Sequence, residues 1–160
     1  MSSHDVYLLS PEIAMVGLAV IVTLLDLIVR KKGILVAVTL GGLAVPLALS
    51  LLLLGDIRGW NWSFWPAAAV ANFDGPTQAI SGIFGTLVVD QFALFFKFLV
   101  LGIVALLVLA SIDYVSKLSR FRGEYYALIL FSATGMMLLA STTELISIYI
   151  SLELTALPLA

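Results

Sequence analysis

A long stretch without charge limits the folds open to this chain. Residues 34–54 contain no Asp, Glu, Lys or Arg and are mostly aliphatic. The hydrocarbon core of a bilayer is about 30 Å thick and takes about 20 helical residues to cross. The stretch also holds Gly41, Gly42 and Pro46, which membrane helices tolerate better than soluble helices do. It therefore predicts a transmembrane helix.

The composition extends this prediction to the whole chain. Hydrophobic residues make up 62% of the 160 residues and charged residues 11%, whereas soluble domains average about 45–50% and about 25%. So few charges cannot cover the surface of a soluble fold, which indicates an integral membrane protein. The net charge of −2 is too small to suggest binding to nucleic acid.

Further apolar runs predict a single all-α membrane domain over residues 1–160. The expected helices lie at residues 11–29, 34–54, 92–112, 125–140 and 145–160, with an outer loop at 55–89. Ser10 and Pro11 suit the start of the first helix, and Asp90 can cap the third. Basic residues follow the first run instead of preceding it, so we interpret it as a retained helix and not as a signal peptide.

The connections indicate how the bundle is oriented. Cytoplasmic loops carry an excess of Lys and Arg. The connections that follow the first and the third predicted helix must lie on the same side of the membrane, and both are basic. We therefore place the N-terminus outside. These connections hold Arg30, Lys31 and Lys32, and Lys117, Arg120 and Arg122. The outer loop contains Trp60, Trp62 and Trp65, which are typical of the headgroup region. We expect this loop to lie on the membrane surface.

The chain lacks the residues that usually hold redox groups and metals. It has no cysteine and one histidine, His4. Disulfides, Cys-held iron–sulfur clusters and thiolate zinc are therefore excluded, and so is a bis-His haem. We expect no cofactor and no metal in this segment.

Most acidic residues near the predicted helices have structural explanations. Asp26 can pair with Arg30 one turn later, and Glu12 suits the positive end of the first helix. Glu144 completes a capping-box pattern that begins at Ser141. We interpret all of these as structural.

Lys97 has two interpretations. It lies seven residues beyond Asp90, which is about 10 Å along a helix at about 1.5 Å per residue. Its long side chain could snorkel from there to the outer interface, the interpretation we prefer. The alternative is an inward-facing cation that pairs with a carboxylate elsewhere in the bundle.

Glu153 differs from these charges because it interrupts an apolar run far from a predicted helix end. It lies nine residues beyond Glu144, about 13 Å along the helix and close to the middle of a bilayer core of about 30 Å. A carboxylate at that depth is costly and indicates function. It can act as a proton relay or form a static ion pair, and the residues alone leave both open.

The neighbours of Glu153 suggest a polar environment inside the bundle. Pro158 has no N–H, so the carbonyl of Leu154 loses its usual partner. Tyr149 shares the face of Glu153, while a stripe of small polar residues lies roughly opposite. The stripe consists of Ser147, Ser151 and Thr155. We expect this helix to be buried among others.

Several of these segments resemble subunit N of bacterial NADH:quinone oxidoreductase, the subunit-2 type of respiratory complex I. The resemblance covers nearly the whole chain except the outer loop, and residues 9–13 and Asp26 also fit it. It is most specific in residues 87–97 (LVVDQFALFFK), 122–141 (RGEYYALILFSATGMMLLAS) and 150–158 (ISLELTALP).

The resemblance implies an antiporter-like membrane-arm subunit of about fourteen helices with inverted repeats, of which this chain would be an N-terminal fragment. The family couples electron transfer from NADH to quinone to proton translocation. Its fifth-helix glutamate falls on Glu153, taken to act with a helix-seven lysine beyond Ala160. Lys97, Tyr149 and Pro158 are possible supporting residues.

The resemblance also implies partners and alternatives. NADH, flavin, iron–sulfur clusters and quinone are expected in partner subunits, and the expected partners of this chain are other membrane-arm subunits, lipid and protons. The expected location is the bacterial plasma membrane. Two alternatives remain open: a subunit of an Mrp-type sodium/proton antiporter, and a purely structural membrane subunit in which Glu153 forms a fixed ion pair.

Overall fold

The computed structural model describes residues 3–28, 32–57, 80–82, 86–117 and 122–159 as a helical bundle with one small β-hairpin. Its elements are α1 (Ser3–Leu8), α2 (Ser10–Ile28), α3 (Lys32–Gly42), α4 (Ala44–Ile57), β1 (Ile80–Gly82), β2 (Leu87–Val89), α5 (Gln91–Ala110), α6 (Ile112–Lys117), α7 (Arg122–Ser141), α8 (Leu145–Ala156) and a 3-10 turn, η2 (Leu157–Leu159). The prediction of an all-α membrane protein is confirmed, with the hairpin as an unpredicted addition.

Four helical segments within the described residues are long and apolar enough to cross a membrane. They are Ser10–Ile28, Leu35–Gly55, Gln91–Ala110 and Gly123–Ser141. The shorter apolar helix Leu145–Ala156 follows. The predicted fifth helix thus ends earlier than expected, because the chain tightens into η2 at Leu157–Leu159, where Pro158 cannot continue the α-helical hydrogen bonding.

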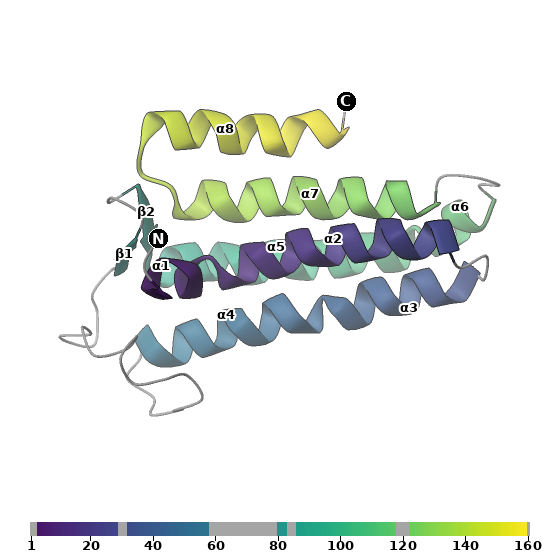
Figure 1. Cartoon of the computed structure of the whole chain (residues 1–160), viewed down its shortest axis with the longest axis horizontal. Helices are drawn as coiled ribbons and strands as arrows, with labels where there is room; N and C mark the ends of the chain where they lie inside the picture. Colours follow the sequence, from purple (N-terminus) through teal and green to yellow (C-terminus); the bar gives the residue numbers. More distant parts are fainter. Residues whose placement is uncertain (1–2, 29–31, 58–79, 83–85, 118–121, 160) are drawn as a thin grey trace.

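The long helices lie side by side along the long axis of the bundle and run in alternating directions (Figure 1). α2 and α5 each pack mainly against α4 and α7, so these four helices form a ring. α8 lies on the outer side of α7, at one edge of the bundle, and α3 with α4 forms the opposite edge. We call the end at which α2, α5 and α8 begin the hairpin end, because β1 and β2 lie there.

Local contacts build the hairpin end. Asp90 caps α5, as predicted, because its Oδ1 accepts a hydrogen bond from the Ala93 N–H at 2.7 Å. The strands β1 and β2 pair antiparallel, and the Thr143 N–H donates to the carbonyl of Thr86 at 3.0 Å. The turn between α7 and α8 is thereby attached to the hairpin. The predicted interfacial tryptophans lie outside the described residues.

The second apolar run forms two helical segments instead of one. α3 ends at Gly42 and α4 begins at Ala44, but hydrogen bonds from Leu43 to the carbonyl of Thr39 and from Leu47 to that of Leu43 carry the helix through the junction. Pro46 removes one N–H from this turn. Gly42 lets α3 approach α2, because a Cβ there would overlap the side chain of Leu18.

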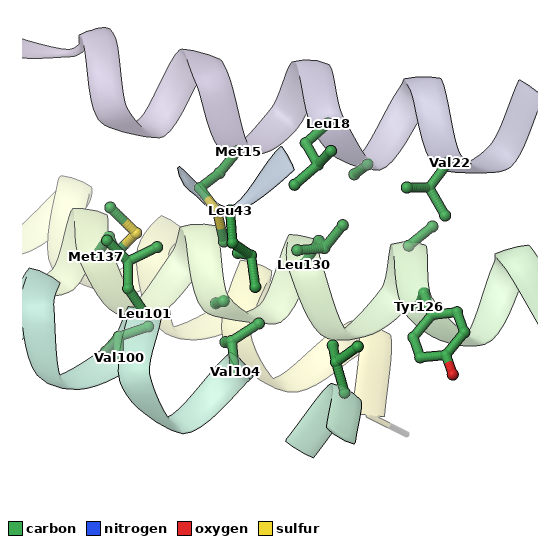
Figure 2. Packing of buried hydrophobic residues seen from close by; sticks show 14 of the residues in the cluster. Met15, Leu18, Val22, Leu43, Val100, Leu101, Val104, Tyr126, Leu130 and Met137 are labelled. Carbon is green, nitrogen blue, oxygen red and sulfur yellow. The ribbon is translucent and has the colours of Figure 1, made fainter. Parts of the chain in front are cut away.

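The main apolar core lies between α2, α5 and α7 (Figure 2). Met15 and Leu18 of α2 face Leu130 and Met137 of α7 across it, and Leu101 of α5 contributes from below. A second apolar cluster lies at the hairpin end. We call it the hairpin-end cluster; its buried members are Tyr7, Leu8, Leu53, Val89 and Leu94.

Candidate functional site

An ion pair is buried at the centre of the helical ring. Lys97 Nζ on α5 lies 2.7 Å from Glu12 Oε1 on α2, and the two side chains are 0% and 4% exposed. Since α2 and α5 each pack mainly against α4 and α7, the pair bridges the ring from one side to the other. Burying charges this way is costly unless they are paired, and here each supplies the other's counter-charge.

Apolar layers enclose the pair on both sides along the helix axis. One turn before Glu12 on α2 is Leu8 of the preceding α1, and one turn after it is Met15. Lys97 lies in the same way between Leu94 and Leu101. Leu8 and Leu94 belong to the hairpin-end cluster and Met15 and Leu101 to the main core, so the charges lie between two apolar layers.

The pair is not fully hydrogen-bonded. The contact between Nζ and Oε1 is close but poorly directed, and neither atom completes a hydrogen bond. Among the described residues, Glu12 Oε2 and the neighbouring Ser10 Oγ also have no hydrogen-bond partner, although both are buried. Native proteins rarely leave buried polar atoms unsatisfied, and each such atom needs an explanation.

Two predictions at this position are wrong. Lys97 does not snorkel to the interface, and Ser10 does not cap α2, because its hydroxyl accepts no hydrogen bond there. The second error comes from α1, which the sequence did not predict. α1 continues almost directly into α2 and buries Tyr7 and Leu8, so Glu12 lies deeper than a first-turn acid. One signal for this pair was available in the sequence, because the first and third predicted helices begin at the same end of the bundle.

The polar stripe of α8 faces α7. Ser151 is buried, and the Ser132 hydroxyl of α7 donates to the Thr155 carbonyl at 2.9 Å. Gly135 allows this approach, because a Cβ there would lie 2.6 Å from Thr155 Oγ1 and 2.7 Å from its backbone nitrogen. α8 is therefore held by close packing and interhelical hydrogen bonding on one side.

Glu153 lies on the opposite side of α8. We call this side the outer face of α8; it consists of the exposed residues Ile146, Tyr149, Ile150, Glu153 and Leu157. We expected several helices to bury α8. Within the described chain, α7 is the helix that packs against it. Pro158 lies just past the helix, where the Leu157 N–H bonds to the Glu153 carbonyl.

The remaining acidic residues have other surroundings. Glu144 is the N-cap residue of α8, but its side chain accepts no capping hydrogen bond, so the predicted capping box is wrong. Ser141 belongs to the end of α7, where its hydroxyl bonds to the Met137 carbonyl instead. Asp26 packs against Gly123 at the start of α7. Its predicted partner Arg30 lies outside the described residues.

Within the described part of the chain, no three acidic or histidine side chains gather into a metal-binding group. The structural features together define a class: an α-helical, multi-pass membrane protein whose described residues include a buried ion pair and an exposed carboxylate on α8.

Comparison with known proteins adds the particular family. The chain is 37% identical, over 98% of its length, to NADH-quinone oxidoreductase subunit N 1 of Koribacter versatilis. It is 34% identical over 92% of its length to subunit N 2 of Symbiobacterium thermophilum. No protein-family model matches the chain. The resemblance to subunit N that the motifs predicted is confirmed, and the chain is related to these subunits along nearly its whole length.

The similarity covers only part of each relative. The chain spans 29% of the length of the Koribacter versatilis protein and 27% of that from Symbiobacterium thermophilum. A match to subunit N of Dehalococcoides mccartyi is closer, at 47% identity, but covers 56% of this chain and 18% of the relative.

Proposed function

We propose that this protein works as a membrane-arm subunit of a proton-translocating NADH:quinone oxidoreductase, respiratory complex I. It would help to couple electron transfer from NADH to quinone to proton movement across the membrane. The observation that carries the proposal is the similarity to subunit N over 98% of the chain. The apolar bundle supports it, since four helices are long enough to cross a bilayer.

Glu153 is the proposed protonatable station. It lies eight residues beyond the start of α8, about 12 Å along the helix, in a stretch with no other charge. Its face of α8 is turned away from α7, which leaves it accessible to further polypeptide. Tyr149 lies one turn earlier on the same face, and Pro158 loosens the backbone hydrogen bonding one turn later. A carboxylate in such surroundings can load and release a proton.

The redox groups belong, in this proposal, to partner subunits. The chain has no cysteine and one histidine, so it does not supply the ligands of an iron–sulfur cluster. Flavin, iron–sulfur clusters, NADH and quinone are assigned to those partners, and this chain contributes ion movement and packing against other membrane-arm subunits.

We place the protein in the bacterial inner membrane with its N-terminus outside. Lys32, Lys117 and Arg122 begin or end helices at the end opposite the hairpin end, and basic residues favour the cytoplasmic side. In an otherwise cysteine-free full-length protein, Gln91→Cys should react with an impermeant maleimide from outside, and Tyr114→Cys only in inverted vesicles. The reverse labelling pattern would contradict this orientation.

The role of Glu153 can be tested with Glu153→Gln in the full-length protein and the assembled complex. We expect proton translocation to fall at least about 100-fold, the low end for loss of a proton-transferring group. The matched control is Glu144→Gln, which changes an exposed acid of the same helix that makes no capping bond. Its proton translocation per NADH oxidised should match that of the wild type.

Unchanged translocation in Glu153→Gln, with the complex intact, would remove Glu153 from the mechanism. The two alternatives give different results. A sodium/proton antiporter would purify without flavin-bearing or iron–sulfur partners, and a purely structural subunit would keep Glu153 ionised throughout an infrared pH titration.

A further inference from the structure

We propose that Glu12 and Lys97 form a hydrated proton-exchange site, separate from Glu153, at the hairpin end of the bundle. The site deepens the proposed function and rests on it for its role in translocation. It stands on its own as a structural and chemical arrangement, which comes from the buried ion pair between α2 and α5.

The unsatisfied polar atoms indicate that the site holds water. Glu12 Oε1, Glu12 Oε2 and Lys97 Nζ are all buried without a hydrogen-bond partner among the described residues. A buried water typically makes about three hydrogen bonds to such groups. A carboxylate and an ammonium together provide both donors and acceptors for it. Water is thus the ligand that matches this set of atoms.

The short contact allows a simple proton step. A proton on Lys97 Nζ can pass to Glu12 Oε1, 2.7 Å away. The ammonium becomes an amine and the carboxylate becomes a carboxylic acid, while the net charge of the pair stays zero. Bound water can then exchange the proton.

The position of the site sets its possible connections. Among the described residues, the hairpin-end cluster separates it from the hairpin end, and the main core separates it from the other end. Among described side chains of the packed elements, Tyr7 of α1 lies in that cluster and Asp90 caps α5. The titratable groups of α7, namely Glu124, Tyr125 and Tyr126, lie near its start at the opposite end. α7 also lies between α5 and α8, so Glu153 is a separate site.

A double substitution distinguishes a proton-exchange site from a fixed ion pair. Glu12→Gln with Lys97→Met removes both charges from the full-length protein, and a buried pair replaced as a unit is often tolerated. In the assembled complex we expect normal amounts of complex and proton translocation reduced at least about 10-fold, less than a full loss of general acid–base catalysis. Wild-type translocation in the double variant would overturn the proposal, with Glu144→Gln as the unaffected control.

Infrared spectroscopy supplies a readout that needs no electron transfer. In full-length protein in lipid vesicles, we expect a carboxylic-acid band that titrates with pH, disappears in the double variant and shifts in D₂O. A Glu12 that stays ionised over the whole pH range of the folded protein would overturn the proposal. If the full-length protein purifies without flavin-bearing or iron–sulfur partners while this band is present, the proposed function fails and the exchange site stands.

Discussion

Glu12 and Glu153 both lie within apolar helices, but their surroundings differ. Glu12 faces into the ring of helices, where Lys97 neutralises it at 2.7 Å. Glu153 lies on the outer face of α8, among exposed apolar side chains. One carboxylate is buried and paired within this part of the chain, and the other is exposed on its surface.

The two carboxylates differ in whether the described helices supply an opposite charge nearby. For Glu12 the opposite charge comes from a residue 85 positions later in the same bundle (97 − 12 = 85). For Glu153 the described chain supplies no opposite charge on the outer face of α8. The following predictions test this contrast, from the largest effect to the smallest.

Removing one member of the buried ion pair should have the largest effect on stability. Lys97→Met leaves Glu12 buried without a counter-charge, and breaking a buried pair costs about 3–5 kcal/mol. We expect a loss of that size in the free energy of unfolding of the full-length protein, measured by denaturant titration in mixed micelles.

The double variant Glu12→Gln with Lys97→Met is the matched control for this prediction. It should recover most of the lost stability, because no uncompensated charge remains. Equal instability of the single and double variants would show that the pair's packing, and not its charge, holds α2 and α5 together.

Gly135→Ala should weaken the attachment of α8. The added Cβ would lie 2.6 Å from Thr155 Oγ1, and overpacking of this kind costs about 1–3 kcal/mol. Amide hydrogen exchange in α8 should accelerate while that of α2 stays unchanged. The control is Gly102→Ala, where a Cβ meets nothing within 4 Å. Similar exchange rates in both variants would mean that α8 is held by something other than its contact with α7.

The smallest effect is expected for Ser132→Ala. It removes the hydrogen bond to the Thr155 carbonyl, and such interhelical bonds in membranes average about 0.6 kcal/mol. Thr23→Val is a suitable control, because the Thr23 hydroxyl bonds within its own helix to the Ala19 carbonyl. A larger loss of unfolding free energy in Thr23→Val than in Ser132→Ala would contradict the assignment of Ser132 to the α7–α8 contact.

The sequence alone determined the class of this protein and the approximate place of each long helix. Uncharged runs near the length of a bilayer leave few alternatives, because backbone polar groups in lipid must be satisfied within helices. It also determined the cap at Asp90, which depends on neighbouring residues only. Local chemistry of this kind does not need a tertiary structure.

Only the tertiary structure decided which charges meet. Lys97 and Glu12 are far apart in the chain, and α1 changes the depth of Glu12. It likewise decided that the polar stripe of α8 faces α7 and that Glu153 faces outward. Helical periodicity shows which residues share a face, but the neighbour of that face depends on the packing of distant segments.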